Sequence, residues 1–309
     1  MTAWLVTGGA GFIGSHLCDA LVAQGDAVRV LDDLSTGKRE NLPPDVELIE
    51  GDVTDPGVVR DALQGVAGCY HLAAIAAVQR GIDEWPLTHR VNQSGTITLL
   101  DAVRRLSERI PVVYASSAAV YGDAAATPMR EDDHCRPLSP YGADKLGCEL
   151  HARVASRLHA IPTVGLRFFN VYGPRQDPRS PYSGVISIFC ERIRRGMPIE
   201  IFGDGGQTRD FVYIGDIVEA LLAAMRLKPV EARVFNVCTE IEISVLDLAR
   251  TIADVAGRPL NVRHRSPRAG EVRHSRGSRI LSRTMLDLGE PVGLRDGLRQ
   301  LLEWLDAVT

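Results

Sequence analysis

Tyr141 and Lys145 stand four residues apart in the stretch SPYGADKLGCE, a spacing that places two side chains on one helical face. Ser139 suits a helix N-cap and Pro140 suits the first turn, so a helix is predicted to begin here. A phenol, with an ordinary pKa of about 10, becomes a base at neutral pH only when its anion is stabilised, and a nearby ammonium can do this. The pair could therefore transfer protons, provided that other groups converge on it.

Three glycines, Gly8, Gly11 and Gly14, follow a short apolar run and open a helical pattern in VTGGAGFIG. Glycines permit a tight turn and a close approach of the backbone, which lets a pyrophosphate lie at the helix N-terminus. A glycine-rich turn alone is often a plain loop. A strand before it and a helix after it make a dinucleotide site the stronger interpretation.

An acidic residue at the end of the next predicted strand is the second mark of such a site. Asp32 in VRVLDD lies about 20 residues on, where a carboxylate can bind the adenosine ribose hydroxyls and repel a 2′-phosphate. Asp33 could serve instead, or merely cap a turn. Lys38 and Arg39 could attract the extra phosphate of NADP, but we interpret them as solvated loop charges, so the pattern favours NAD.

Buried strands must position these residues, and the apolar runs that predict them are AWLVTGG, AVRVLDD, VELIEGD, AGCYHLAA, IPVVYASS and IPTVGLRFFN. Helical patterns such as PGVVRDALQG and QSGTITLLDAVRRL lie between the later runs. This alternation predicts an α/β fold with a Rossmann-like, doubly wound parallel sheet. Asp52 and Val53 follow the third strand, where an adenine could be held, although a turn explains the aspartate equally well.

The second half of the chain has a different composition and a less regular pattern of strands and helices. A loop rich in proline, glycine and arginine, VYGPRQDPRSPYSG, is expected to drape over a site, and mixed helices and short strands follow it. We expect residues 1–170 to form the NAD-binding domain, with returning segments from about 205–240. Residues 171–309 should form mainly a smaller, interleaved α/β domain that binds substrate, with any cleft between the two.

Composition argues against several classes of protein. A formal net charge of -4 disfavours a general nucleic-acid binder, because phosphate neutralisation needs an excess of Lys and Arg. Six cysteines show no Cys-x-x-Cys spacing, which predicts reduced packing residues and neither a disulfide framework nor a metal site. No run reaches signal-peptide or membrane-spanning length, so we expect a cytoplasmic protein without a membrane partner.

Eight ordered motifs together point to one family. They are TGGAGFIGSH, LDDLSTG, HLAA, ASSAAVYG, SPYGADK, LRFFNVYGPRQ, FGDGGQTRDFVYIGD and RAGEVRHS, and they span nearly the whole chain. The chain resembles the extended short-chain dehydrogenases/reductases, and within them the NAD-dependent nucleotide-sugar epimerases that act on UDP-glucose or UDP-N-acetylglucosamine. The resemblance implies bound NAD, a UDP-sugar substrate and a homodimer paired through the QSGTITLLDAVRRL helix and the Tyr141 helix.

By this resemblance Ser117, Tyr141 and Lys145 are the catalytic trio, with Asn92 as a supporting residue. Tyr141 would take the proton of the sugar 4-hydroxyl while the 4-hydrogen leaves as hydride to NAD. The 4-keto sugar would then turn over and receive the hydride on its other face. Ser117 would hydrogen-bond the reacting hydroxyl and relay its proton.

The same resemblance assigns larger sets to the cofactor and to the substrate. The cofactor set is Gly8, Gly11, Phe12, Ile13, Gly14, Asp32, Asp33, Leu34, Ser35, Gly37, Asp52, Val53, Leu72, Ala73, Ala74, Asn92, Tyr141, Lys145 and Phe168. The substrate set is Ala76, Ser117, Asn170, Val185, Phe202, Arg209, Arg268, Glu271 and Ser275. In it the two arginines and Asn170 hold the diphosphate, because a guanidinium fork fits phosphate oxygens, and Glu271 accepts from a ribose hydroxyl. Val185 and Phe202 line the uracil pocket or, alternatively, belong to the core.

Two small residues bear on the choice of sugar. Hexose-only members of the family carry a bulky aromatic at the position of Ser275 and a lysine at that of Ala76. The small side chains of this chain should leave room for a 2-acetamido group, whereas spare room rejects a smaller group only weakly. We therefore expect interconversion of UDP-GlcNAc and UDP-GalNAc, leaving UDP-Glc/UDP-Gal open as a second activity.

Three rival functions can be weighed against this one. A sugar 4,6-dehydratase needs a further acid and base after Ser117, where this chain has Ala118 and Ala119. A UDP-glucuronate 4-epimerase or decarboxylase stays open, because Arg80 or Arg175 could bind a carboxylate. A binding protein that keeps NAD without catalysis is disfavoured by the intact trio.

Overall fold

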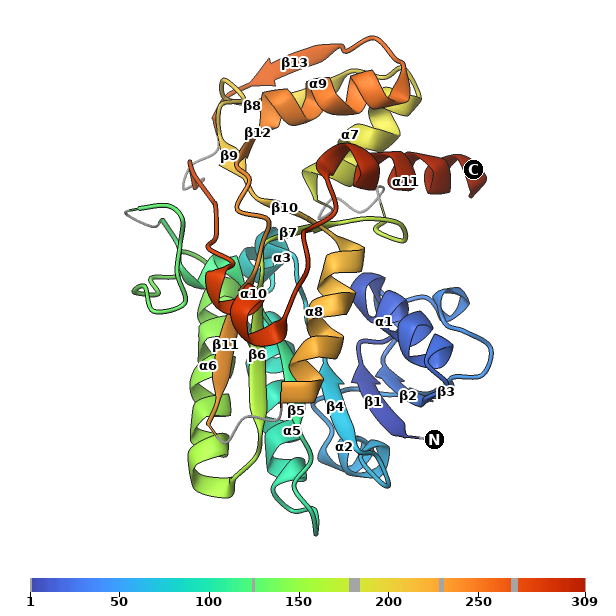
Figure 1. Ribbon diagram of the computed structural model, residues 1–309, viewed down its shortest axis with the longest axis vertical. Helices are drawn as coiled ribbons and strands as arrows, with labels where there is room; N and C mark the ends of the chain where they lie inside the picture. Colours follow the sequence, from blue (N-terminus) through green and yellow to red (C-terminus); the bar gives the residue numbers. More distant parts are fainter. Residues whose placement is uncertain (1, 124–125, 178–183, 228–230, 268–271, 309) are drawn as a thin grey trace.

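A seven-stranded parallel sheet forms the larger lobe of the computed structural model, which describes residues 2–123, 126–177, 184–227, 231–267 and 272–308 (Figure 1). The strands are β1 (Ala3–Thr7), β2 (Ala27–Asp32), β3 (Glu47–Glu50), β4 (Gly68–His71), β5 (Val112–Ser117), β6 (Thr163–Phe168) and β11 (Arg233–Val237). Their order is β11-β6-β5-β4-β1-β2-β3, so the chain reverses its direction of progress between β1 and β4. The predicted Rossmann-like sheet is confirmed.

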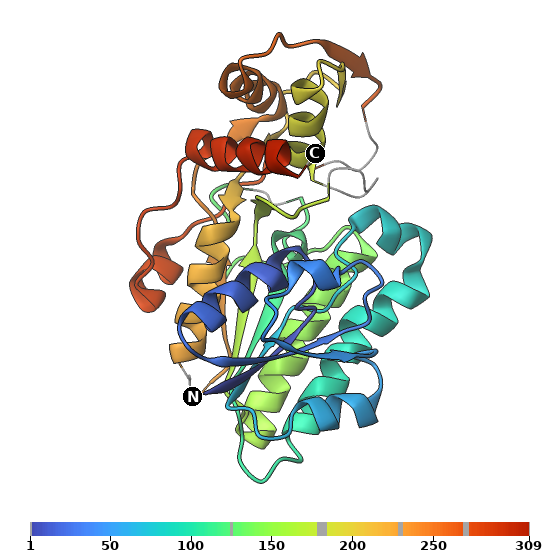
Figure 2. The ribbon, with the colours of Figure 1, turned by 90° about the vertical axis from the view of Figure 1, so that its right-hand side faces the viewer.

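Helices cover both faces of this sheet (Figure 2). One layer contains α1 (Phe12–Ala23) and α8 (Ile214–Leu227), and the other contains α2 (Pro56–Ala62), α5 (Gly95–Val103) and α6 (Pro140–His159). Successive residues of a strand pack against opposite helix layers. Val6 and Val30 pack with the first layer, and Leu5 and Leu31 pack with the second. Since strand side chains alternate with a period of two, a strand buried on both faces must be apolar throughout, as these runs are.

The helical segment between β4 and β5 begins earlier than its apolar pattern predicts. Two short helices, α3 (Val78–Asp83) and α4 (Trp85–His89), lead through a π-helical turn at Arg90–Ser94 into α5. The start of α6 is as predicted: Pro140 occupies the first turn, and the Oγ of Ser139 accepts a hydrogen bond from Gly142 N at 3.1 Å.

The smaller lobe lies beyond the carboxyl ends of the sheet strands (Figure 1). Its helices α7 (Val185–Arg194), α9 (Val245–Ala256) and α11 (Leu294–Ala307) pack on one another. Its short strands pair as β7 (Asn170–Tyr172) with β10 (Phe211–Tyr213), β8 (Ile199–Phe202) with β13 (Val262–Arg265), and β9 (Thr208–Arg209) with β12 (Ile243–Ser244). Helix α10 (Ile280–Leu286) then packs against α8 and β11, a return to the larger lobe that lies outside the range predicted for returning segments.

A buried polar network joins α6 to the centre of the sheet. The carboxylate of Glu149 accepts from Arg167 at 2.9 and 2.7 Å and from Ser116 Oγ at 2.5 Å. Arg167 also donates to the hydroxyl of Tyr121 at 2.8 Å, and that hydroxyl donates to Asn236 Oδ1 at 2.7 Å. The network therefore joins the helix to β5, β6 and β11 at residues that stand opposite one another in the sheet.

All six cysteines are free and five of them are buried, as predicted for packing residues. Among the residues that the structure describes, no helix combines the length and the apolar character that crossing a bilayer requires.

Candidate active site

The glycine turn joins β1 to α1 at the point where the strand order reverses. Because β2 and β4 flank β1 and lead away in opposite directions, the turn lies at the crevice where doubly wound sheets bind ligands. Gly8 has a φ of 70°, and a Cβ on it would lie 2.7 Å from Ala73 N. A Cβ on Gly14 would collide with Gly8 O. Helix α1 starts at this close approach with Gly11 as N-cap and no side-chain cap, which fits a pyrophosphate.

Asp32 ends β2 and holds the glycine turn. Its carboxylate accepts from Ala10 N and from Leu34 N, both at 2.9 Å. Burial raises the pKa of this carboxyl, and the two backbone donors partly oppose the rise. Asp33 is exposed instead, and its carboxylate accepts from the N–H and hydroxyl of Ser35. Of the two acids, Asp32 is the one that faces the glycine turn.

The loop after β4 forms the other wall of the crevice. Asn92 closes this loop with two hydrogen bonds to Ile75, because its Oδ1 accepts from the N–H at 2.7 Å and its Nδ2 donates to the carbonyl at 3.0 Å. Asn92 lies in the π-helical turn and is buried. Its side chain therefore shapes the loop that carries Ala73 and Ala74. Ala76, farther along, is exposed.

Beneath this loop, His71 is buried between two threonines. Its Nδ1 lies 2.8 Å from Thr7 Oγ1 and its Nε2 lies 3.0 Å from Thr96 Oγ1. Because Thr96 donates to Asn92 O, it can only accept from Nε2–H, and Nδ1 then accepts from Thr7. The Thr7 oxygen in turn accepts from Ala73 N at 3.3 Å. A neutral imidazole thus connects both walls of the crevice, and burial lowers its pKa to about 3.

Tyr141 and Lys145 lie in the first turns of α6, and both are buried. The ammonium of Lys145 donates to Ala115 O at 2.9 Å and lies 5.9 Å from the centroid of the Tyr141 ring. The predicted proximity of phenol and cation is therefore present, and a β5 carbonyl holds the cation in place.

Ser117 ends β5, two residues beyond Ala115. Its Oγ accepts from Ala119 N at 3.1 Å, and in the sheet it stands opposite Phe168, the last residue of β6. A Cβ on Gly142 would lie 2.6 Å from Ala119 O, so the start of α6 can approach this turn only because residue 142 is glycine. Ser117, Tyr141 and Phe168 consequently gather at the carboxyl edge of the sheet.

Asp52 and Val53 occupy the turn after β3. Asp52 accepts from Thr54 N at 2.8 Å, which is the turn interaction that an aspartate often makes, and Val53 is buried against Gly95. Both residues lie at the carboxyl edge of the sheet, beside the carboxyl end of β2.

A cavity of about 310 Å³ lies in the smaller lobe, at the lower end of the range for small-ligand pockets, roughly 300–1,000 Å³. Its lining residues are Phe202, Gly203, Asp204, Gln207, Pro267, Val272 and Arg273. Phe202 is thus at a cavity, whereas Val185, at the start of α7, is half-buried and is not among these lining residues. Arg268 and Glu271 lie outside the described residues, between Pro267 and Val272.

Six of the seven lining residues, all but Phe202, are absent from the sequence-based assignment, and two of these six are charged. Arg273 and Asp204 form a two-fold ion pair, with both N–O distances at 2.9 Å. The motifs FGDGGQ and RAGEVRHS contain them, so the signal was available, but spacing alone does not reveal that these motifs meet.

Of the other predicted substrate residues, Arg209 lies directly beside this cavity. Arg209 donates to Val272 O at 2.9 Å, next to the cavity. Asn170 donates from its Nδ2 to Asp210 O at 3.0 Å. Ser275 is buried on the segment that continues from Arg273.

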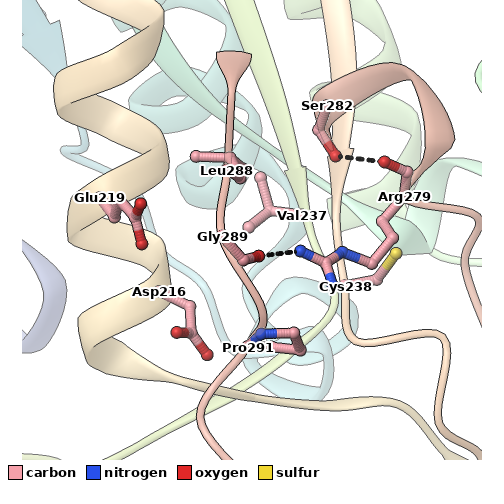
Figure 3. A pocket seen from close by; sticks show the side chains of 9 residues that line it. All are labelled: Asp216, Glu219, Val237, Cys238, Arg279, Ser282, Leu288, Gly289 and Pro291. Atoms are coloured by element: carbon pink, nitrogen blue, oxygen red, sulfur yellow. Dashed lines mark hydrogen bonds between the residues drawn. The ribbon is translucent and has the colours of Figure 1, made fainter. Parts of the chain in front are cut away.

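Other candidate groups are occupied elsewhere. Arg80 pairs with Glu84 at 3.0 Å and Arg175 with Asp19 at 2.7 Å. A second cavity, of about 20 Å³, lies between α8 and the 279–291 segment, beside Arg279 (Figure 3). It has room for about one water molecule. Within the described ranges no three His, Cys, Asp or Glu side chains gather as metal ligands would.

Comparisons with known proteins agree with this geometry. The model of the NAD dependent epimerase/dehydratase family matches residues 4–238. A UDP-glucose 4-epimerase from Mycolicibacterium smegmatis is 37% identical over 97% of each chain. The structure of a Thermotoga maritima UDP-glucose 4-epimerase with UDP-glucose superposes with a TM-score of 0.95 at 34% identity, covering 99% of each chain. A UDP-N-acetylglucosamine 4-epimerase from Methanobrevibacter ruminantium, in complex with UDP-N-acetylmuramic acid, gives 0.94 at 32% identity, covering 100% of this chain and 99% of the other.

Because the pKa of His71 is low in the folded chain, the free energy of unfolding should depend on pH. Between pH 6.5 and about 3 the unfolded chain takes up a proton on this residue that the folded chain does not. The contribution is complete above pH 6.5 and is lost as the pH falls, by about 5 kcal/mol in total. We expect His71→Gln to reduce proton uptake on unfolding by nearly one proton in this window, measured by urea unfolding at a series of pH values. His134→Gln, at an exposed site, is the control; equal slopes for wild type and His71→Gln would contradict the assignment.

Proposed function

This chain belongs to the NAD dependent epimerase/dehydratase family, and on that premise we propose that it interconverts UDP-GlcNAc and UDP-GalNAc. As an NAD-dependent UDP-sugar 4-epimerase it is an isomerase. The observation that carries the proposal is the convergence of Ser117, Tyr141 and Lys145 at the carboxyl edge of the sheet, the edge that also carries the glycine turn, with a separate cavity in the smaller lobe for the nucleotide.

The crevice suits NAD in shape and in charge. Gly8 and Gly14 leave no room for side chains, because the turn packs tightly against the loop after β4 and against the start of α1, and Gly11 between them would let a pyrophosphate approach the helix N-terminus. Asp32 keeps a carboxylate at the ribose position, where a 2′-phosphate would be repelled. Bound there, NAD would supply a reversible hydride acceptor for carbon four of the sugar, with no net oxidation over the cycle.

Three side chains would handle the proton. Tyr141 takes it from the sugar 4-hydroxyl, and the ammonium of Lys145, 5.9 Å from the ring centroid, stabilises the phenolate that starts the reaction. Ser117, at the end of β5, hydrogen-bonds the same hydroxyl and can relay its proton. Burial of Tyr141 and Lys145 keeps water from competing for these bonds.

The nucleotide would bind between the lobes, with the larger lobe holding the cofactor and the smaller one the nucleoside diphosphate. Phe202 offers an apolar wall for a uracil ring, and Arg209 stands beside the same cavity as a phosphate ligand. Arg268 and Glu271, which follow Pro267, complete the predicted set.

One observation bears on the 2-acetamido group and another on the uronic-acid alternative. Ser275 is a small, buried residue on the wall of the substrate region, so it leaves space where a large aromatic would not. Arg80, one of the two predicted carboxylate ligands of the uronic-acid alternative, already pairs with Glu84, and Arg175 pairs with Asp19 through Nη2 while its buried Nη1 has no hydrogen-bond partner within the described residues.

A panel of UDP-sugars tests the function directly. Incubated without added NAD, the purified protein is expected to convert UDP-GlcNAc to UDP-GalNAc, with slower conversion of UDP-Glc and none of UDP-glucuronic acid. Tyr141→Phe removes the proton acceptor and should lower kcat by about 100-fold or more while the bound NAD is retained. Products are separated by chromatography; rapid turnover of the uronic acid alone would refute the substrate choice.

The size of residue 275 is the proposed selectivity device. Ser275→Tyr should lower kcat/KM for UDP-GlcNAc at least about tenfold more than for UDP-Glc, because a clash affects only the larger 2-substituent. Ser275→Ala is the matched control and should leave the ratio of the two substrates nearly unchanged. Equal losses for both substrates in the tyrosine variant would show that this residue does not discriminate.

We also propose a homodimer formed through α5 and α6. Leu150, Val154 and Leu158 follow one another at four-residue spacing on α6 and are all exposed, and Ile97 of α5 is partly exposed. A helical apolar stripe of this kind suits a four-helix contact between two copies. Analytical ultracentrifugation should give twice the chain mass, and Val154→Asp with Leu158→Asp should give one; a wild-type monomer would contradict the proposal.

A further inference from the structure

Asp210 receives six hydrogen bonds and is fully buried between β9 and β10. Its Oδ1 accepts from the N–H and the hydroxyl of Thr239, both at 2.7 Å. Its Oδ2 accepts from Glu240 N at 3.0 Å and Gly277 N at 3.3 Å. Its carbonyl accepts from the N–H and the side-chain amide of Asn170, both at 3.0 Å.

These bonds join three chain segments that are far apart in the sequence. Asn170 opens β7, Thr239 and Glu240 follow β11, and Gly277 lies two residues beyond Ser275. The neighbour of Asp210 on β9 is Arg209. The three predicted substrate residues are therefore all close to Asp210 along the chain or through a bond. Asn170 bonds to it directly, Arg209 precedes it, and Ser275 lies two residues before Gly277, which bonds to it.

The segment with Ser275 is also held from its other side. Met129 N donates to Arg276 O, and Ser278 N donates to Met129 O, both at 2.8 Å. A Cβ on Gly277 would lie 2.5 Å from the Phe169 ring and 2.7 Å from Cys238 Sγ. The backbone of residues 276–278, directly after Ser275, is thus confined between Met129 and Asp210.

We propose that Asp210 is a positioning residue that fixes the distance between the Asn170 wall and the Ser275 wall, and so sets the affinity of the site for the nucleotide sugar. The inference rests on the proposed function, since it takes those two walls to contact the substrate. A carboxylate is required here because it offers two acceptor oxygens to four donors. In an asparagine at this position, the side-chain NH2 group would face the N–H groups of residues 239–240 or 277, so that a donor would meet donors.

Asp210→Asn should lower the affinity for UDP, measured by calorimetry, by about tenfold or more, and raise KM for UDP-GlcNAc similarly. We expect the bound NAD to be retained and kcat to change by less than about threefold, because the trio lies on other segments. The control is Asp216→Asn, which alters another buried carboxylate that accepts a backbone bond, from Val292 N, beside the small cavity of Figure 3. It should lower stability and leave UDP affinity unchanged.

Gly277→Ala tests the same wall with Asp210 intact, and decides the matter if Asp210→Asn does not fold. It should also weaken UDP binding, whereas Gly289→Ala, whose Cβ would enter open space, should not. Wild-type UDP affinity in both the Asp210→Asn and Gly277→Ala proteins, or equal losses in Asp210→Asn and Asp216→Asn, would overturn the inference. Failure of the wild type to bind UDP would instead overturn the proposed function.

Discussion

Glu149 and Arg167 meet in the interior as an ion pair with 5% or less of either side chain exposed, and the start of α6 and the carboxyl ends of β5 and β6 are assembled around them. Removing two charges from water costs several kcal/mol each, so such a pair is tolerated only when its other donors and acceptors are filled, as Ser116 and Tyr121 fill them here. An unpaired member would cost about 3–5 kcal/mol. Because a shift of α6 along β5 and β6 would separate the pair and incur this cost, the pair fixes the position of the helix along these strands. Because Tyr141 and Lys145 lie on the same helix, eight and four residues earlier, their height above Ser117 follows from that pair.

Buried polar side chains perform the same task for the loops. Asp32 holds the glycine turn, Asn92 closes the loop after β4, and Asp210 holds the walls of the substrate region. In each case a side chain accepts from the backbone N–H groups of a segment that no sheet or helix would otherwise order. Functional groups on loops need such support, because loops lack the repeated hydrogen bonds that fix strands and helices.

The cofactor side of the site could be predicted far better than the substrate side. Gly8, Gly11 and Gly14 follow β1 and Asp32 ends the neighbouring strand β2, an arrangement that the spacing of one strand–turn–helix–strand unit predicts directly. Cavity residues such as Arg273 and Asp204 are 69 positions apart and meet because β8 pairs with β13 and Thr208 N donates to Arg273 O. No period or spacing along the chain reports that pairing.

The sequence by itself determined the alternation of strands and helices, the helix start at Ser139 and the i, i+4 placement of Tyr141 and Lys145, because propensity, capping and helical period are local properties. Tertiary structure alone decided that Asp32 and not Asp33 faces the glycine turn, that Lys145 is held by Ala115, and that Asp210 joins three segments. Those outcomes depend on which buried donors and acceptors come within hydrogen-bonding distance, and burial is a property of the folded chain as a whole.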